Sequence, residues 1–471
     1  MKNIKFLFIN LLLVGTFISC DKSLDLEPED SLTPSVIFSN QTLAQSALEG
    51  MYSNCQQADA LSGTFDAMTE WQSDNVNFVG SFPTFNEIKD YAILSANGSI
   101  ANVWIDHYEV INNANVIIAR VPNVSDPNFI QADKDNMVGQ AKFIRALMFF
   151  RLSQSFGVQL KQDPTGNQKS IPLALVPFEG NVLFPSRNTL NEVYNQIEAD
   201  LLSAEMTITN TSKAKATAAS AQALLARLYL YKENWSGAAT YAQKVISTPG
   251  ISMAANYSFY NAASPEHVFQ LQNVAGDAQG GASPAYSSLF NPVLFGGRGD
   301  CPFSQDLKDL FLLKPTDLRY SITLTRSGNN AGNVLDLFTR KYPNGTRTDD
   351  PNVLRVSEMH LIRCEANFKG GLSVGGIAPL VDLNRTAIRA GLSGANLYTV
   401  VNNQNILDER RKEFCFEGLR RMDLLRNNLP LRPATNAQFA KSAPNQPYVT
   451  FPIPQREIDI NPALSPNNAG Y

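Results

Sequence analysis

The chain has 471 residues, of which 44% are hydrophobic, 10% aromatic and 17% charged. This length suffices for one large domain or two to three interlocked ones, and the aromatic content excludes a disordered chain. The 39 Lys and Arg residues nearly balance the 43 Asp and Glu residues and form no long basic run. Nucleic acid is therefore excluded as a partner, because phosphate binding requires a basic stripe.

Residues 1–19 have the pattern of a secretory signal peptide. Lys2 and Lys5 precede an uncharged stretch, 6–19, which is shorter than the roughly twenty apolar residues of a membrane-spanning helix. The stretch ends in Phe-Ile-Ser-Cys at Cys20, which resembles the lipobox of bacterial lipoproteins. In such proteins the signal is cut before the cysteine, which is then acylated, so we expect lipidation at Cys20. The alternative is an ordinary signal peptide followed by an incidental cysteine.

Residues 20–37 are predicted to form an acidic tether behind the lipid. The acids of this segment are Asp21, Asp25, Glu27, Glu29 and Asp30, against Lys22 as the one base, and Pro28 and Pro34 should keep it extended. Two lipid signals are needed for stable anchoring. The three acyl chains of a bacterial lipoprotein would therefore attach the protein permanently to a membrane. The folded body should begin near Phe38.

Helical periodicity dominates the body of the chain. One apolar face is formed by Ala221, Leu224, Leu225, Leu228 and Tyr229, and the pattern restarts at Trp235 and runs to Ile246. Two helices with alanines at facing positions predict a hairpin like a tetratricopeptide unit. Further apolar faces cover 137–156, 190–206, 353–368, 377–388 and 406–416. We predict a mainly α fold, a tetratricopeptide-like helical-repeat scaffold with long irregular loops, and we expect Trp104 and Trp235 in its core.

Two long loops are predicted at 56–99 and 250–350. Both are rich in Asn, Ser, Gly and Pro, yet they contain too many aromatic residues for disorder. A helical scaffold that presents aromatic loops is a binding architecture.

The remaining chemical signals have structural explanations. The charges of 408–426 nearly cancel at helical spacing, which favours a partly buried ion-pair network. The α/β-hydrolase and P-loop motifs are absent, and the three histidines are too far apart for the common zinc motifs. We expect no metal site and no cofactor, although incidental calcium binding stays open. The cysteines of the body are Cys55, Cys301, Cys364 and Cys415, and the sequence cannot decide whether any of them pair.

The order of short motifs along the chain resembles the SusD/RagB family of outer-membrane nutrient-uptake lipoproteins. The matching segments are LDLEP at 24–28, AKFIRALMFFRL at 141–152, AQALLARLYLY at 221–231, SPEHVF at 264–269, DLR at 317–319, residues 355–366, LDERRKEF at 407–414, FEG at 416–418, FPIP at 451–454 and NAGY at 468–471. The chain departs from the family pattern at Ser465, and in a polar insert that precedes Ile171.

This resemblance implies a division of the chain and a function. Residues 38–250 would form the N-terminal helical-repeat region and 251–471 the C-terminal region, interlocked in one body. Such proteins bind glycan fragments at the cell surface without catalysis. They cap a SusC-like TonB-dependent transporter, which docks on the helical-repeat face, while the loops on the other side hold the ligand. The alternatives are the same role for a peptide or another nutrient and, a third class, a surface hydrolase, for which no reactive constellation is found.

The ligand residues are expected in the two long loops. Trp71 lies in a polar stretch, so its ring could cover the apolar face of a sugar while Asp74 or Asn75 bonds the hydroxyl groups. One stacked ring contributes roughly 1–2 kcal/mol, too little for useful affinity. Further ligand contacts are therefore expected, and the candidates are Phe78, Tyr286, Phe290, Phe295 and Arg298.

Overall fold

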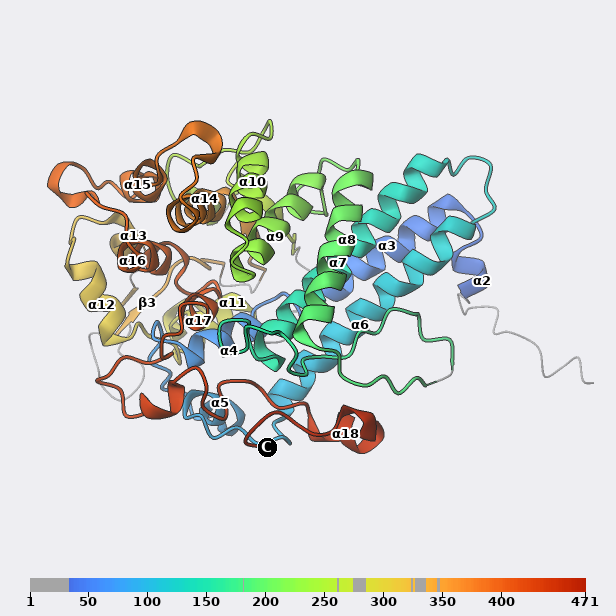
Figure 1. Ribbon diagram of the computed structural model, residues 1–471, viewed down its shortest axis with the longest axis horizontal. Coiled ribbons are helices and arrows are strands. Elements are labelled where there is room, and N and C mark those ends of the chain that lie inside the picture. The colour runs from blue at the N-terminus through green and yellow to red at the C-terminus, as the bar shows by residue number, and fades with distance from the viewer. Residues whose placement is uncertain are drawn as a thin grey trace, which may run out of the picture.

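The computed structural model describes residues 34–180, 182–260, 262–273, 285–322, 325–326, 336–344 and 348–471. The helices of the N-terminal half are α2 (Pro34–Ile37), α3 (Gln41–Cys55), α4 (Thr64–Gln72), α5 (Pro83–Lys89), α6 (Gly98–Arg120), α7 (Gln131–Phe156), α8 (Leu190–Thr207), α9 (Ala218–Tyr231) and α10 (Trp235–Ile246). The long helices α3, α6, α7 and α8 pack side by side at one end of the molecule, and most of the C-terminal helices gather at the other, whereas α18 lies apart at the bottom of the view (Figure 1).

The C-terminal half contains shorter elements. Its helices are α11 (Tyr286–Phe290), α12 (Gln305–Leu312), α13 (Leu318–Ile322), α14 (Val356–Gly370), α15 (Pro379–Arg389), α16 (Asn403–Phe414), α17 (Arg420–Leu425) and α18 (Gln455–Ile460). Among the described residues the strands are β1 (His267–Gln270), β2 (Thr325–Arg326), β3 (Leu337–Phe338) and β4 (Asn352–Arg355). They form two antiparallel pairs, β1 with β4 and β2 with β3. The predicted mainly α fold is confirmed.

The predicted helix hairpin is α9 and α10, which pack against each other. Thr217 begins α9 as its N-cap, and its hydroxyl accepts a hydrogen bond from the Ser220 N–H. Asn234 caps α10 in the same way, with a bond from the Gly237 N–H. Ala238, Ala239 and Ala242 of α10 are buried, and their small side chains allow the close approach of the two helices.

Three expectations about loops and helix ends were wrong. The first predicted loop, 56–99, contains α4 and α5, and the second, 250–350, contains short helices and strands. The helix expected over 353–368 begins only at Val356, because 352–355 form β4 and pair with the distant β1. Pro34 does not extend the tether but begins α2, since the first helical turn tolerates proline.

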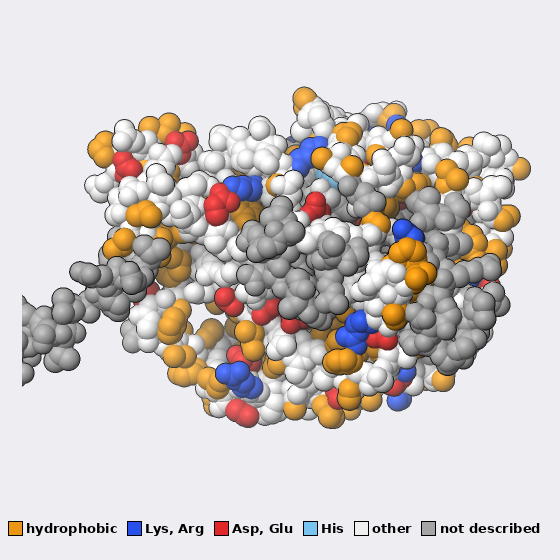
Figure 2. Space-filling model, turned by 180° about the vertical axis from the view of Figure 1, so that it is seen from behind, with side chains coloured by type: hydrophobic (Ala, Val, Ile, Leu, Met, Phe, Trp, Pro, Cys, Tyr) orange, Lys and Arg blue, Asp and Glu red, His pale blue; other side chains and the backbone are white. Residues whose placement is uncertain are grey.

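The segment that follows α7 carries exposed apolar side chains over α6. Asn115 of α6 donates hydrogen bonds to the carbonyls of Ala174 and Val176, and the Phe178 N–H donates to Asn112 at 2.8 Å. The exposed apolar residues of this segment, here called the apolar arm, are Leu175, Val176, Phe178, Val182, Leu183 and Phe184. In the view from behind, hydrophobic side chains gather at the lower left, toward the end that contains α2 and α3 (Figure 2). In the described ranges, no helix is long and apolar enough to cross a bilayer.

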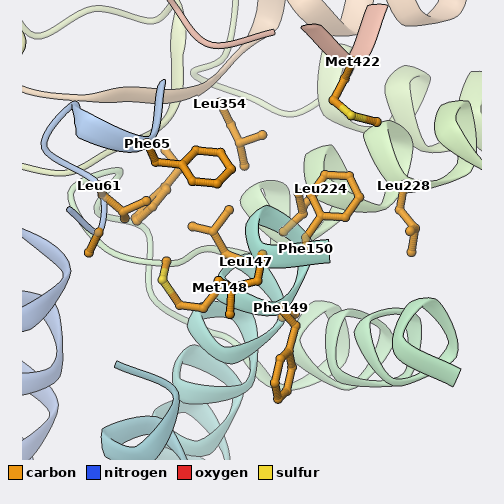
Figure 3. Packing of buried hydrophobic residues seen from close by; sticks show 14 of the residues in the cluster. Leu61, Phe65, Leu147, Met148, Phe149, Phe150, Leu224, Leu228, Leu354 and Met422 are labelled. Atoms are coloured by element: carbon orange, nitrogen blue, oxygen red, sulfur yellow. The ribbon is translucent and has the colours of Figure 1, made fainter. Parts of the chain in front are cut away.

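The main hydrophobic core is built around α7, most of whose side chains from Met137 onward are buried. Phe150 of α7 lies beside Leu224 of α9, and Leu147 lies near Phe65 of α4 (Figure 3). Trp104 is 3% exposed and packs edge-on against Phe156, at 5.0 Å between ring centroids, so its predicted core position is confirmed. Trp235 is partly buried and packs against the same core.

The charged segment 408–426 forms the predicted ion-pair network, and it is more deeply buried than expected. Arg319 bonds Glu409 at 2.6 Å, and Arg355 bonds Glu413 at 2.6 Å and Glu417 at 2.9 Å. Other members of the network are Asp317, Glu266, Lys341, Arg389 and Lys412. Five carboxylates thus face three arginines and two lysines, and this balance is the condition under which buried charge is tolerated.

A small acidic cluster joins α6 to the turn before α4. Burial raises the pKa of the Asp106 carboxyl, repulsion by the neighbouring carboxylates of Asp59 and Glu109 adds to this, and the resulting pKa is about 7. Burial also raises the pKa of Asp59. Between the ordinary aspartate pKa of about 4 and about 7, Asp106 is therefore protonated in the folded protein and ionised in the unfolded chain.

We expect the substitution Asp106→Asn to stabilise the protein at alkaline pH. Because the pKa is raised in the folded state, the stability contributed by the protonated form is lost as pH rises from about 4 through about 7. The gain from the substitution should therefore be larger near pH 8 than near pH 5, measured by urea unfolding at both values. The surface substitution Asp135→Asn on α7 serves as the control. An equal effect of Asp106→Asn at both pH values would contradict the prediction.

Candidate functional site

The two predicted loops meet through their backbones. The Asn77 N–H donates to the Pro302 carbonyl, and the Val79 N–H donates to that of Asp300, both at 2.9 Å. Val76 and Phe303 form an isolated antiparallel bridge between the same two stretches. The segment after α4 and the segment before α12 are thus held side by side, as a two-loop binding site requires.

Trp71 does not serve as an exposed sugar platform, so that prediction was wrong. The residue belongs to α4, whose residues are all buried, and its side chain has no exposed surface. Its indole N–H donates to the Cys301 thiol at 3.2 Å, and its ring packs against Phe85 at 4.2 Å and Phe78 at 5.1 Å between centroids. Trp71 therefore links the two loops through buried contacts.

The side chains of Asp74 and Asn75 bond arginines, so they are not available for the hydroxyl groups of a sugar. Arg420 donates twice to the Asp74 carboxylate, at 2.8 Å each. Although burial alone would raise the pKa of Asp74, the positive charges of Arg411 and Arg420 hold it well below its ordinary value. The Asn75 amide donates to Glu70 at 2.9 Å and accepts from Arg411 at 2.9 Å. Both residues fix the loop: Asn75 is fully buried, which contradicts its predicted contact with ligand, whereas Asp74 is 7% exposed and has its carboxylate engaged by Arg420.

Tyr286 and Phe290 are also core residues, contrary to prediction. The Tyr286 hydroxyl donates to Asp66, and its ring stacks on Tyr342 at 4.5 Å between centroids. Phe290 is fully buried and packs edge-on against Phe416 at 5.5 Å. Burial against partners far away in the sequence leaves neither ring a free face.

The other candidates lie nearer the surface. Phe78 is 4% exposed. Phe295 is partly exposed, and the Arg340 guanidinium covers its ring at 4.3 Å from the centroid. Arg298 is partly exposed, and its guanidinium lies over the ring of Phe82 at 4.3 Å and donates to Asp300 at 2.9 Å. These residues border the surface where the loops meet, but the Phe78 ring has almost no free face.

Phe82 is the exposed aromatic residue that sequence reasoning did not single out. Its side chain is 49% exposed, and its ring stacks on Phe85 at 5.2 Å with 22° between the ring planes. Phe82 stands at the N-cap of α5, immediately before Pro83, which starts the helix. An aromatic residue just before an N-terminal proline lies outside the helix, and this local signal could have drawn attention to it.

Close packing of Gly80 against Phe78 and Asp300 fixes the backbone near Phe82. A Cβ atom on Gly80 would lie 2.5 Å from the Phe78 ring and 2.8 Å from the Asp300 carboxyl carbon. The Asn86 amide also donates to the Gly80 and Phe82 carbonyls, each at 3.1 Å. The loop that carries Phe82 is therefore fixed from both sides.

Phe78, Phe85 and Phe82 form an aromatic row, and a pocket of about 440 Å³ opens at its Phe78 end. This volume is within the usual size range of small-molecule sites. Phe78 and Asp74 line the pocket, and its accessible polar residues are Asn77, Lys89, Asp90, Gln305, Asp306, Thr435, Asn436 and Gln438. Phe78 packs against Phe85 at 6.0 Å, and Phe85 carries Phe82. The pocket and the exposed Phe82 ring together are called the loop-convergence site.

A third segment completes the site. The Arg432 guanidinium, 6% exposed, donates to the backbone carbonyls of Ser73, at 2.5 Å, and of Trp71. It thereby fixes residues 433–438 against the first loop, so that three distant parts of the chain enclose the pocket. The 430–446 region lies outside the two loops, 56–99 and 250–350, in which the ligand residues were expected.

The chemistry of the loop-convergence site suits a polyhydroxylated ligand. Amides can donate and accept hydrogen bonds, while the carboxylates of Asp90 and Asp306 accept them. Lys89 lies 3.0 Å from Asp90, and Arg411 lies 2.5 Å from Asp306, so these charges are paired. An exposed, flat Phe82 ring can cover an apolar C–H face.

Metal and thiol chemistry find no support in the described part of the chain. There, no three His, Cys, Asp or Glu side chains are grouped as a metal site would require. Cys55, Cys301, Cys364 and Cys415 are buried and unpaired. Burial raises the pKa of each of these thiols, which makes them poor nucleophiles. Lipidation of Cys20 lies outside the described residues.

Comparison with known proteins agrees with this architecture. Residues 22–230 match a family model described as starch-binding associating with outer membrane, and 325–471 match the SusD family model. SusD-like protein P2 of Formosa agariphila is 25% identical, and the alignment covers 100% of both chains.

The solved structures that resemble this chain share its fold. A SusD superfamily protein of Bacteroides thetaiotaomicron has a TM-score of 0.80 and 23% identity, covering 90% of this chain and 98% of its own. A structure titled putative sugar binding protein, from Bacteroides vulgatus, has a TM-score of 0.79 and 25% identity, with 91% and 98% coverage. A protein titled laminarin binding SusD-like protein has a TM-score of 0.73 and 22% identity, with 92% and 100% coverage. The family match over both ends, together with the shared tetratricopeptide-like helical fold, leads to one conclusion: this chain belongs to the SusD/RagB family.

Proposed function

We propose that this protein binds an oligosaccharide at the cell surface and delivers it, without catalysis, to a SusC-like TonB-dependent transporter. Membership of the family supports the outer-membrane setting, since one matching family model is described as starch-binding associating with outer membrane. A relative of similar fold is titled a putative sugar binding protein, which supports a glycan as the ligand class.

The observation that carries the proposal is the loop-convergence site. The half-exposed Phe82 ring stacks on Phe85, and Phe85 packs against Phe78 in the lining of a pocket of about 440 Å³, whose accessible lining is mostly amide and carboxylate. Sugars combine an apolar C–H face with hydroxyl groups, and this arrangement offers a partner for each. The Arg298 guanidinium lies 4.3 Å from the Phe82 centroid and 5.4 Å from that of Phe85, where it supports the Phe82 ring and can donate to a hydroxyl group.

Delivery requires contact with the transporter, and the apolar arm offers a surface for it. Phe178 is 59% exposed and Leu183 61% exposed, within a short segment tied to α6. Contiguous exposed apolar side chains mark protein interaction sites in soluble domains. This surface belongs to the helical-repeat side, where the family resemblance expects the barrel to dock, while the acylated Cys20 would keep the protein at the membrane.

The substitution Phe82→Ala is expected to weaken glycan binding. Loss of one stacked face should cost about 1–2 kcal/mol, or roughly 5- to 30-fold in Kd. The side chain is half exposed, so the thermal unfolding midpoint should change little. Isothermal titration calorimetry against a panel of glycans and a panel of peptides would first identify a ligand and then measure the change.

The matched control is Phe178→Ala, which removes an equally exposed phenylalanine from the apolar arm. It should leave glycan affinity unchanged. Unchanged affinity of Phe82→Ala would remove the ring from the site. Binding to peptides alone would favour the alternative nutrient role, and release of reducing sugar from a bound glycan would contradict a non-catalytic protein.

A further inference from the structure

A second pocket, with a volume of about 710 Å³, lies near the C-terminus of the chain. It is lined by parts of the segment that follows α7, by Ser186 and Arg187, and by parts of 444–450 and 463–469. The C-terminal segment passes beside the chain that follows α7 (Figure 1). We call it the C-terminal pocket; none of its lining residues belongs to the loop-convergence site.

The charged side chains that line the C-terminal pocket are all positive. Among the described residues that line it, Lys169 and Arg187 are cationic and none is a carboxylate. The loop-convergence pocket, by contrast, contains three aspartates next to its cations. The C-terminal pocket therefore presents positive charge to whatever enters it.

Arg187 is held by neutral oxygens. Its guanidinium is 5% exposed and donates to the backbone carbonyls of Ser170 at 2.8 Å, Lys169 at 2.7 Å and Pro466 at 2.8 Å, and to the Asn468 side chain. Arg355, in the ion-pair network, is instead surrounded by carboxylates. Burial lowers the pKa of Arg187 to about 10, as expected for a charge without an anionic partner.

Two acids of the neighbouring segments, Asp163 and Glu192, are directed elsewhere. Asp163 accepts from the Gln168 N–H at 2.8 Å and from Thr165. Glu192 accepts from the Thr189 N–H at 2.7 Å as part of the capping box of α8, although its charge also attracts Lys169. Both carboxylates are engaged by backbone groups, and neither lines the pocket.

The rest of the lining suits a sugar. Gln168, Asn445 and Gln446 are exposed amides that can bond hydroxyl groups in either direction. Pro444, Pro447 and Pro466 add apolar surface among them. The polar insert before Ile171 and Ser465, the two departures from the family pattern, both contribute to this lining.

We propose that the C-terminal pocket is a second binding site that takes an acidic oligosaccharide, with Lys169 and Arg187 facing its carboxylate or sulfate group. The buried guanidinium supplies a fixed positive charge, and the exposed ammonium of Lys169 supplies a donor at the rim. Amides around them hold the hydroxyl groups. The site goes beyond the proposed function, since it adds a charge preference that the loop-convergence site does not have.

Calorimetry on the purified protein tests this proposal with three probes: a galacturonate trisaccharide, a neutral galactose trisaccharide and its sulfated counterpart. The galacturonate or the sulfated probe should bind, more weakly as salt rises, and the one that binds identifies the anion. Lys169→Gln and Asn445→Asp should each weaken that binding about 5-fold, since one removes a charge-assisted bond and the other adds repulsion. Both side chains are exposed, so the fold should persist.

The matched control is Lys161→Gln, which removes an exposed lysine of the same segment that pairs with Glu233 and does not line the pocket. It should leave binding of the acidic probe unchanged. The proposal is overturned if neither acidic probe binds, or if Lys169→Gln and Asn445→Asp leave acidic binding unchanged. If Phe82→Ala abolishes binding of the acidic probe while Lys169→Gln and Asn445→Asp do not, the probe binds at the loop-convergence site. That result would overturn the second site but would support the proposed function.

Discussion

Replacing Glu413 by alanine is expected to reduce the free energy of unfolding by about 3–5 kcal/mol, the usual cost of removing one partner from a buried ion pair. Glu413 is 1% exposed and accepts hydrogen bonds from Arg355 at 2.6 Å, Arg319 at 3.3 Å and Arg389. These guanidiniums hold the pKa of Glu413 well below its ordinary value, although burial alone would raise it. Without the Glu413 carboxylate, the buried positive charges of the three arginines would be only partly compensated.

Urea unfolding monitored by circular dichroism measures this change. Glu413→Gln keeps the shape of the side chain and should cost nearly as much, because the missing element is the charge. The control is Glu179→Ala, which removes one partner of the exposed Arg120–Glu179 pair and should cost less than about 1 kcal/mol. Since the pKa of Glu413 is lowered by folding, its contribution should be present at neutral pH and lost only in strong acid. Equal stabilities of Glu413→Ala and Glu179→Ala would show that the network does not stabilise the fold.

Replacing Cys20 by alanine is expected to abolish membrane attachment. The pattern of residues 1–20 predicts acylation at this cysteine. A triacylated protein should sediment almost completely with the outer-membrane fraction, whereas the variant should be recovered in the soluble fraction. Membrane fractionation, together with the mass of the N-terminal peptide, gives the answer.

Cys55→Ala is the control for this experiment. Cys55 is fully buried at the end of α3, so its loss should leave fractionation unchanged. Membrane retention of Cys20→Ala without a lipid on the N-terminal peptide would contradict the lipoprotein assignment. It would then favour an ordinary signal peptide, with attachment through a partner protein.

The helices could be predicted because their signals are local. α10 was expected at 235–246 and occupies Trp235–Ile246, since its cap at Asn234 and its stop at Pro249-Gly250 stand next to it in the sequence. Charges at helical spacing on α16 pointed to a buried ion-pair network, but the arginines that pair with Glu413 are Arg319, Arg355 and Arg389, which lie outside 408–426.

The ligand residues could not be predicted in this way, because their exposure depends on partners far along the chain. Trp71 looked free in its polar surroundings, yet its indole bonds Cys301, 230 positions away. Asp74 seemed ready for hydroxyl groups, yet Arg420 holds it from 346 positions away. Phe82 received no special attention, yet the folded chain leaves its ring half exposed near the place where the two loops meet.

The sequence by itself determined the helical scaffold and the family, and it predicted an export signal and aromatic loops that carry the site. These features depend on neighbours within a few turns of helix, or on the order of motifs along the chain. Only the tertiary structure decided which aromatic rings reach the surface, which arginines lack a carboxylate, and where pockets open. The reason is physical: burial and charge pairing are set by contacts between residues hundreds of positions apart, such as Arg187 with Pro466.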